Sequence, residues 1–358
     1  MQAIGFPSRY RQGAGLLDEL GAEAARLGRR PLVLCDTFVR GAFGPRVEAS
    51  LGAANLRPAW ADFAGECSPS AIEAAVGTAR RNGCDAVVGM GGGKAIDTGK
   101  GVSIETGLPM IVVPTVASND SPVSRLAITY EDDGTFIGPR LMARNPDAVL
   151  VDTAVIAAAP TRFLVAGIGD ALVTMFEAEQ CAASGAETFF GARPTQAGLA
   201  LARACHDVVR AHGPEAVRDV DADRVTEAVE RVTEANVLLS GLGFEGCGVA
   251  AAHAIGMAFT LLPAMKGVLH GEEVAVGLMA QFALEGRDDA FMDDVRRFYS
   301  AVRLPTSLRD LGIDAIADAE VEAVAAFAAR PGSRLHNMSF PVDAGMVRDA
   351  IREVGRRA

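Results

Sequence analysis

The chain has 358 residues, more than a single hydrophobic core usually holds, so two domains are expected. Acidic residues outnumber lysine and arginine by 45 to 34, which gives a net charge of −11. This charge argues against binding to negatively charged partners such as nucleic acids and anionic membranes. The six cysteines form no CxxC pair and no secretory signal opens the chain, so we expect free thiols and a cytoplasmic protein.

Short apolar runs alternate with helical patterns between residues 31 and 152. The runs PLVLCD, PAWADF, CDAVVGM, PMIVVPT and AVLVD have the composition of buried strands. Ser68 followed by Pro69 is typical of a helix start, and a hairpin is expected around residues 131–134. The alternation predicts a parallel sheet with helices on both faces, an α/β Rossmann-like domain over residues 1–158.

The run GMGGGKAID, residues 89–97, joins one of these strands to a helix. Glycines such as Gly92 and Gly93 let backbone amides approach a diphosphate at the helix N-terminus, although the run is neither GxGxxG nor a P-loop. Lys94 supports this interpretation, because a cation in the first helical turn opposes the helix dipole unless an anion offsets it. A tight strand-to-helix turn without a ligand is the alternative.

Polar residues follow two further strands. Asp36 ends PLVLCD, where a carboxylate can bind ribose hydroxyls and repel a 2′-phosphate, which favours NAD over NADP. The loop VPTVASNDSPVS supplies Thr115 and Ser118 as candidate cofactor contacts and Asp120 as a candidate for holding a substrate hydroxyl. An ordinary turn residue and a capped turn are the alternatives.

Long patterns with a period near 3.6 follow residue 160, for example over residues 194–212 and 221–239. They predict an all-helical domain over residues 159–358, which would bind metal and substrate. The uncharged stretch 246–265 could span a bilayer by length, but it contains His253 and Pro263, so we interpret it as a buried core helix.

Three residues of this helical region form a candidate metal site. His253 and His270 flank its most apolar part, whereas His206 and His212 have the pattern of surface and helix-end positions. Asp170, in GIGDAL, stands where a glycine-flanked loop is expected to meet a helix, so capping is its default explanation. One carboxylate and two imidazoles suit catalytic zinc, but the long spacing leaves a buried structural histidine as the alternative.

Taken together, these residues resemble the glycerol dehydrogenases, members of the metal-dependent alcohol dehydrogenase superfamily that shares its fold with dehydroquinate synthase. The similarity covers most of the chain and includes many ordered matches, which makes it more specific than any one motif. The matching segments are GECSPSAIE, GMGGGKAIDTGK, VPTVASNDSPVS, NPDAVLVDT, RFLVAGIGDAL, EANVLLSGLGFEGCGVAAAHA, LHGEEVAVG and LHNM.

The resemblance implies an NAD-dependent, homo-oligomeric enzyme that oxidises a secondary alcohol of a small polyol or vicinal diol. It implies a metal, zinc or else iron, held by Asp170, His253 and His270, with Asp120 at a substrate hydroxyl. The NAD contacts that it implies are Asp36, Gly93, Lys94, Asp97, Thr115, Ser118, Ser124, Leu126 and Tyr130.

The chain departs from the family pattern near the metal. Gly256 stands where the glycerol enzymes typically have a second histidine, and MKGVL, residues 265–269, replaces a His- and Tyr-rich segment. We expect these positions to face the substrate, so that their loss of polar groups weakens binding of glycerol itself. The alternatives are a dehydroquinate-synthase-like cyclase and a glycerol-1-phosphate dehydrogenase, which need more cations than Lys266, and a non-catalytic protein without metal.

Overall fold

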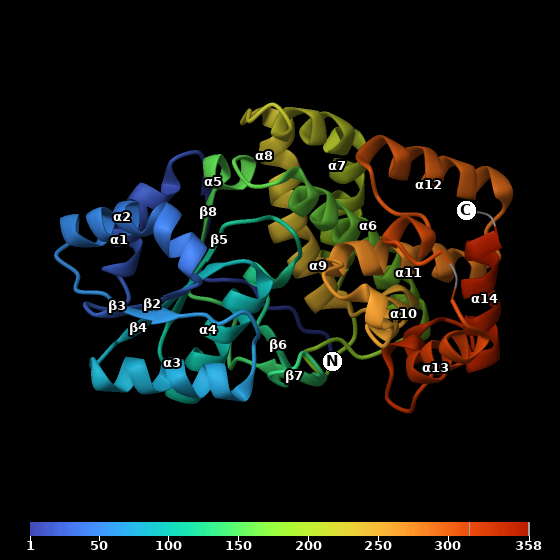
Figure 1. Ribbon diagram of the computed structural model, residues 1–358, viewed down its shortest axis with the longest axis horizontal. Helices are drawn as coiled ribbons and strands as arrows, with labels where there is room; N and C mark the ends of the chain where they lie inside the picture. Colours follow the sequence, from blue (N-terminus) through green and yellow to red (C-terminus); the bar gives the residue numbers. More distant parts are fainter. Residues whose placement is uncertain (315, 357–358) are drawn as a thin grey trace.

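Six parallel strands form the sheet of the N-terminal half (Figure 1). The structure is a computed structural model that describes residues 1–314 and 316–356. The sheet has the order β1-β8-β5-β4-β2-β3, and all its neighbouring strands are parallel. The strands are β1 (Tyr10–Gly13), β2 (Pro31–Cys35), β3 (Ala59–Asp62), β4 (Ala86–Gly91), β5 (Met110–Pro114) and β8 (Ala148–Asp152). The predicted parallel sheet is therefore confirmed.

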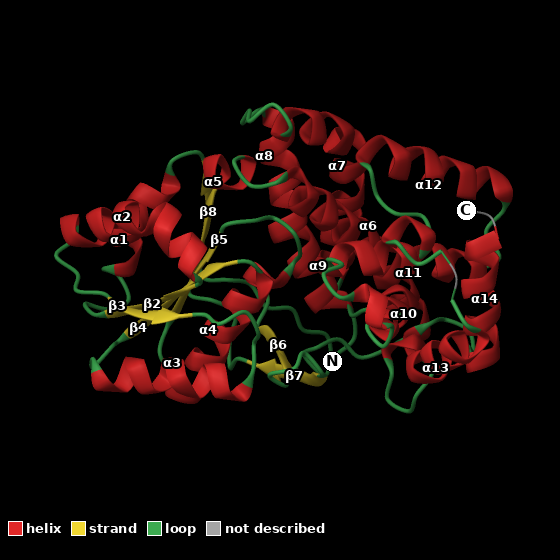
Figure 2. Ribbon diagram, viewed as in Figure 1, coloured by secondary structure: helices red, strands yellow, loops and turns green. Residues whose placement is uncertain are grey.

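Helices cover both faces of this sheet, which is why its central strands are apolar along their whole length (Figure 2). On β2, Val33 and Cys35 pack toward one core cluster, whereas Leu32 and Leu34 pack toward the other. The first cluster lies under α1 and α2, and the second lies under α3 and α4 and continues into the helical half. These helices are α1 (Leu20–Ala24), α2 (Thr37–Ala53), α3 (Pro69–Arg81) and α4 (Gly93–Thr106).

A two-stranded antiparallel hairpin stands beside the sheet, as predicted. It consists of β6 (Leu126–Tyr130) and β7 (Phe136–Leu141), joined by a turn in which the amide of Glu131 donates to the carbonyl of Thr135 at 2.7 Å. The fully buried Lys100 links α4 to the hairpin, because its Nζ donates to the carbonyl of Leu126 at 2.5 Å.

Helices make up the C-terminal half from α6 onward, as the 3.6-residue periodicity predicts. The short α5 (Thr153–Ala157) precedes them, and a π-helical turn (Ala235–Leu239) links α8 to α9. The boundary expected after residue 158 stays a prediction. The helices are α6 (Thr161–Ser184), α7 (Gln196–Val220), α8 (Glu227–Glu234), α9 (Ser240–Cys247), α10 (Ala251–Phe259), α11 (His270–Leu284), α12 (Asp289–Val302), α13 (Asp318–Ala328) and α14 (Ala344–Arg356).

Several expected helix boundaries are wrong. The helix expected from residue 221 begins at Glu227, because the hydroxyl of Thr226 caps it by accepting from the amide of Val229. His212 is not at a helix end, since α7 runs on to Val220.

The single core helix expected over residues 246–265 is wrong, because α9 ends at Cys247 before Gly248, whose φ is 97°, and α10 extends only from Ala251 to Phe259. Among the described residues no single helix is long and apolar enough to cross a membrane. The segments Glu227–Cys247 and Ala251–Phe259 meet that test only together, and they are bent by 107°.

Candidate metal centre and cofactor loops

The three expected metal ligands come together from three helices. Asp170 lies on α6, His253 on α10 and His270 at the start of α11. Asp170 Oδ1 is 3.4 Å from Nε2 of His253 and 3.6 Å from Nε2 of His270, and one ligand atom from each residue lies within 4.8 Å of the others. The arrangement joins residues that are 100 positions apart in the sequence.

The buried carboxylate of Asp170 fits a divalent cation. Its Oδ1 is buried and has no hydrogen-bond partner among the described residues, while Oδ2 accepts from the backbone amide of Asp120 at 3.1 Å. An unpartnered buried oxygen costs about 1–3 kcal/mol, and more when it is charged. One carboxylate and two imidazoles form a ligand set that suits zinc or iron.

Charges in the centre shift the pKa values in opposite directions. Burial lowers the pKa of His253, but the carboxylates of Glu177 and Asp170 outweigh burial and raise it well above its ordinary value. Burial raises the pKa of Asp170, but His270 and His253 outweigh burial and lower it. The protonated imidazoles must release protons when a metal binds, which makes metal affinity depend on pH.

The expectation that Asp170 caps a helix is wrong. Asp170 lies in the interior of α6, and the glycines before it are helical. Glycine lets the loop after β5 pack against α6, because a Cβ on Gly167 would stand 1.9 Å from the carbonyl oxygen of Ala117. A glycine-rich sequence that predicts a loop therefore marks close helix packing here.

Glycines also bring the three ligand-bearing helices together. A Cβ on Gly271, next to His270, would stand 1.7 Å from the carbonyl oxygen of Ala166 on α6. A Cβ on Gly277 would stand 2.2 Å from the carbonyl oxygen of Ala252 on α10. The positions of the ligands thus depend on backbone contacts that any larger residue would block.

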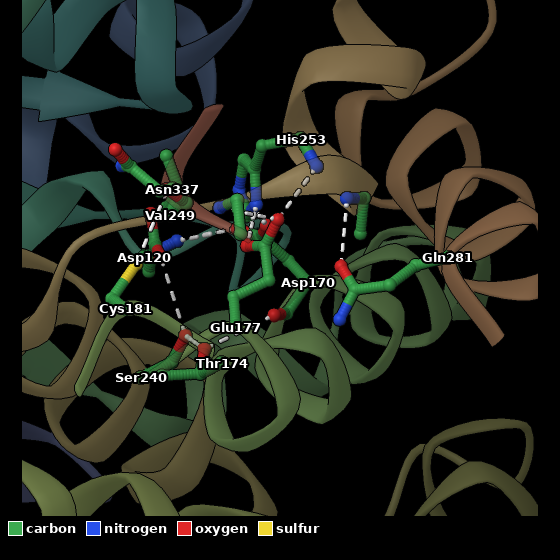
Figure 3. A network of polar contacts seen from close by, with 12 residues as sticks. Asp120, Asp170, Thr174, Glu177, Cys181, Ser240, Val249, His253, Gln281 and Asn337 are labelled. Atoms are coloured by element: carbon green, nitrogen blue, oxygen red, sulfur yellow. Dashed lines mark hydrogen bonds and ion pairs between the residues drawn. The ribbon is translucent and has the colours of Figure 1, made fainter. Parts of the chain in front are cut away.

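Glu177, which sequence reasoning missed, orients His253 (Figure 3). Its Oε2 lies 2.5 Å from Nδ1 of His253, and its Oε1 accepts from the amides of Ala250 and His253 at 2.8 and 2.9 Å. Glu177 follows Asp170 by seven residues, which is two helical turns on one face of α6. This spacing was the available signal in the sequence.

Asp120 lies beside the metal ligands, as expected for a residue near the substrate. Its backbone amide donates to Asp170, and its Oδ2 accepts from the hydroxyl of Ser240 at 3.3 Å, a contact that Thr174 extends (Figure 3). Burial and the charge of Asp170 raise the pKa of Asp120 to about 8. The polar loop after β5 is therefore bound directly to the helical half.

The glycine turn opens α4 as predicted, with Gly92 as the cap and Gly93 as the first helical residue. A Cβ on Gly93 would stand 2.3 Å from the side-chain nitrogen of Asn119, so a larger residue here would force the Asn119 side chain to move. Lys94 has an anion in the protein itself, because its Nζ lies 2.6 Å from Oε2 of Glu66. The lysine also lies over the ring of Tyr130, at 5.2 Å from its centroid.

The other expected cofactor residues have two kinds of surroundings. Asp36 follows β2, where it caps α2 by accepting from the amide of Val39, and Thr115 and Ser118 lie in the loop after β5. Asp97 accepts instead from Lys100, Ser121 and the amide of Ile128. Ser124 and Leu126 also contact Lys100. The role of each as an NAD contact stays a prediction.

Gly256 does not face open space. It is buried, and a Cβ there would meet Cα of Val274 and the carbonyl carbon of Glu273 on α11 at 3.1 and 3.2 Å. A side chain at this position would start against α11, so the glycine adds to the close packing of α10 and α11. In the segment after it, Met265 is buried and Lys266 is exposed.

Comparison with known proteins gives full-length similarities. The family described as iron-containing alcohol dehydrogenase matches residues 7–153. A glycerol dehydrogenase of Thermotoga maritima is 41% identical over 98% of this chain and 96% of its own, and a glycolaldehyde reductase of Halobacterium salinarum is 41% identical over 98% and 97%. The crystal structure of a probable glycerol dehydrogenase from Sinorhizobium meliloti 1021 shares 43% identity with a TM-score of 0.95 over 100% of both chains.

Proposed function

The chain belongs to the glycerol dehydrogenase family of the iron-containing alcohol dehydrogenases, and from this membership we propose that it is an NAD-dependent polyol dehydrogenase. The proposed reaction oxidises a secondary alcohol of a small polyol or vicinal diol to a ketone, or runs in reverse. The observation that carries the proposal is the triad of Asp170, His253 and His270, whose buried carboxylate oxygen has no hydrogen-bond partner among the described residues.

A metal held by this triad would supply the Lewis acid. When bound, zinc, or iron as the alternative, would polarise the reacting hydroxyl and lower its pKa. Asp170 contributes the negative charge and the two histidines contribute neutral nitrogens, so the ligands leave a divalent ion with net positive charge toward the substrate. The burial of Asp170 keeps water from competing for that charge.

We infer that Asp120 orients the substrate. Its loop is fastened by its own backbone amide to Asp170, and the hydroxyl of Ser240 holds its carboxyl group. A hydroxyl next to the reacting one could hydrogen-bond to this carboxyl group, so the second hydroxyl would align the first for reaction. This geometry supports a diol or polyol over a monohydric alcohol.

The carboxyl ends of the central strands support an NAD site. Asp36, Gly92 and Thr115 each follow one of the neighbouring strands β2, β4 and β5, which end at the same edge of the sheet. Amides at the start of α4 suit a diphosphate, and Asp36 favours an unphosphorylated ribose. Assembly as a homo-oligomer and a cytoplasmic location also remain part of the proposal.

The names of the relatives point to more than one substrate. Proteins that are equally similar to this chain are named glycerol dehydrogenase and glycolaldehyde reductase. Gly256, where the resemblance implies a second histidine, packs against α11 and supplies no side-chain polar group. We therefore propose a small polyol or vicinal diol with a secondary hydroxyl as the substrate class, without assigning glycerol.

Purified enzyme should reduce NAD with members of a panel of diols, polyols and cyclitols. A chelator should abolish this activity and added zinc or iron should restore it, because the proposed Lewis acid is lost and regained. Absorbance at the nicotinamide band measures the rate. Turnover of a phosphorylated sugar without net NAD reduction would instead indicate a cyclase, and activity that survives complete metal removal contradicts the proposal.

Replacing Lys94 by alanine should weaken NAD binding roughly 10- to 100-fold, as expected from loss of a charged hydrogen bond. The loss also leaves Glu66 without its partner near the diphosphate. Fluorescence titration with NADH measures the dissociation constant. Arg80→Ala, which removes an exposed charge near the end of α3, is the control and should bind normally. Normal binding by Lys94→Ala would show that Lys94 serves only Glu66.

A further inference from the structure

Glu177 is a fully buried carboxylate whose partners all lie at the start of α10. Its Oε1 accepts from two backbone amides, those of Ala250 and His253, and its Oε2 lies 2.5 Å from Nδ1 of His253. Among the described residues, no lysine or arginine forms an ion pair with this carboxylate. Its contacts are thus directed to one imidazole and the backbone that carries it.

These contacts determine which nitrogen of His253 carries hydrogen. An ionised carboxylate can only accept, so the nitrogen that faces it, Nδ1, must donate. In the neutral ring, the form that binds a metal, the other nitrogen, Nε2, then has its lone pair free, and it is the nitrogen that lies 3.4 Å from Oδ1 of Asp170. The tautomer that Glu177 selects is therefore the one that can bind a metal beside Asp170.

We propose that Glu177 is a positioning residue for the metal centre, which holds the His253 ring in the orientation and tautomer in which Nε2 ligates the ion. The inference rests on the proposed function, because it assumes that the triad binds metal. It adds a residue that touches neither metal nor substrate and acts through His253. A carboxylate behind a histidine ligand also raises the basicity of that ligand.

A structural role for Glu177 in the start of α10 is the competing explanation. The cap residue of α10, Ala250, has no side chain that can accept from the first amides, and Glu177 accepts from two of them. Gln281 performs a similar task nearby, because its Oε1 accepts from the amide of Ala252 at 3.0 Å. In the described structure Gln281 makes no hydrogen bond to the His253 ring, so a Gln281 variant tests capping without positioning.

Glu177→Gln distinguishes positioning from capping. The two amides can only donate, so the amide oxygen of the glutamine must take the place of Oε1, and its NH₂ group must face Nδ1. The imidazole must then accept at Nδ1 and carry its hydrogen on Nε2, where it blocks the metal. We expect zinc affinity to fall roughly 10- to 100-fold, the range for lost partners of metal-bound histidines.

The experiment measures zinc affinity of the full chain by competition with a chromophoric chelator, and the His253 tautomer by ¹⁵N NMR of the metal-free and zinc-loaded protein. Gln281→Leu is the control, which should lower the melting temperature of the metal-free protein but keep zinc affinity within about twofold of wild type. Neither readout requires turnover.

Each outcome bears on one proposal. Wild-type protein that binds no zinc, and equally no iron, overturns the metal-centre proposal itself. If wild type binds zinc and Glu177→Gln binds it equally well, the positioning role is wrong and capping suffices. Should Glu177→Gln fail to fold, the spectrum of the zinc-loaded wild type decides: hydrogen on Nδ1 supports the inference, and zinc bound to Nδ1 overturns it.

Discussion

An Asp170→Asn enzyme should lose its tightly bound metal and at least about 10³-fold in kcat/KM. The substitution keeps the shape and the acceptor for the amide of Asp120, but it removes the only carboxylate of the triad. A loss of 10³-fold corresponds to about 4 kcal/mol of transition-state stabilisation, within the several kcal/mol that a Lewis acid supplies. Metal analysis and steady-state kinetics with excess zinc or iron measure the two effects.

Metal binding should also be visible as stability. A ligand at 100 times its dissociation constant stabilises the folded state by about 2.7 kcal/mol, so zinc should raise the melting temperature of wild type but not of Asp170→Asn. Asp152→Asn is the control: Asp152 is equally buried, but it caps α5 and binds the amides of Gly15 and Leu17. This variant should be less stable and still bind metal. Stoichiometric metal in Asp170→Asn would contradict the assignment.

Gly271→Ala should be the most destabilising single-methyl substitution near the centre. The added Cβ would stand 1.7 Å from the backbone oxygen of Ala166, so the clash cannot be relieved by turning a side chain. Helices α6 and α11 would have to separate, at a cost of about 3 kcal/mol or more in the free energy of unfolding. Because His270 precedes Gly271, we also expect metal affinity to fall at least about tenfold.

Urea unfolding of the metal-free protein and chelator competition measure these two effects separately. Gly52→Ala is the matched control, since Gly52 is also helical but a Cβ there meets nothing within 4 Å. This variant should be unchanged or gain about 0.5–1 kcal/mol, because alanine favours a helix over glycine. Equal stability of the two variants would show that α6 and α11 can move apart freely.

The folding of the N-terminal half could largely be predicted from local signals. Apolar runs of strand length, the Ser68–Pro69 helix start, the hairpin turn and the glycine turn before α4 each act over a few residues, and each is present in the structure. Such signals are strong because strands buried on both faces must be apolar throughout and because caps satisfy nearby amides.

Local sequence patterns do not predict a residue's conformation or contacts where these depend on a partner far away in the sequence. Gly167 and Gly169 predict a loop, but they lie within α6, and the carbonyl oxygens of Ala117 and Gly271 approach them too closely for a side chain. Glu66, in another loop, supplies an anion for Lys94 that no local pattern indicates, and a phosphate contact of Lys94 stays a prediction. Gly248 falls within an expected helix, although its positive φ ends one.

For the metal centre too, some features follow from the sequence and others only from the tertiary structure. The sequence alone determined the alternating α/β half, the helical half and, through its resemblance to a family, the three residues of the triad. Only the tertiary structure decided that Asp170 lies inside a helix, that its Oδ1 has no hydrogen-bond partner in the part of the chain that the structure describes, and that Glu177 holds His253. Periodicity and capping act between neighbours in the chain, whereas ligand geometry depends on how closely three separate helices can approach.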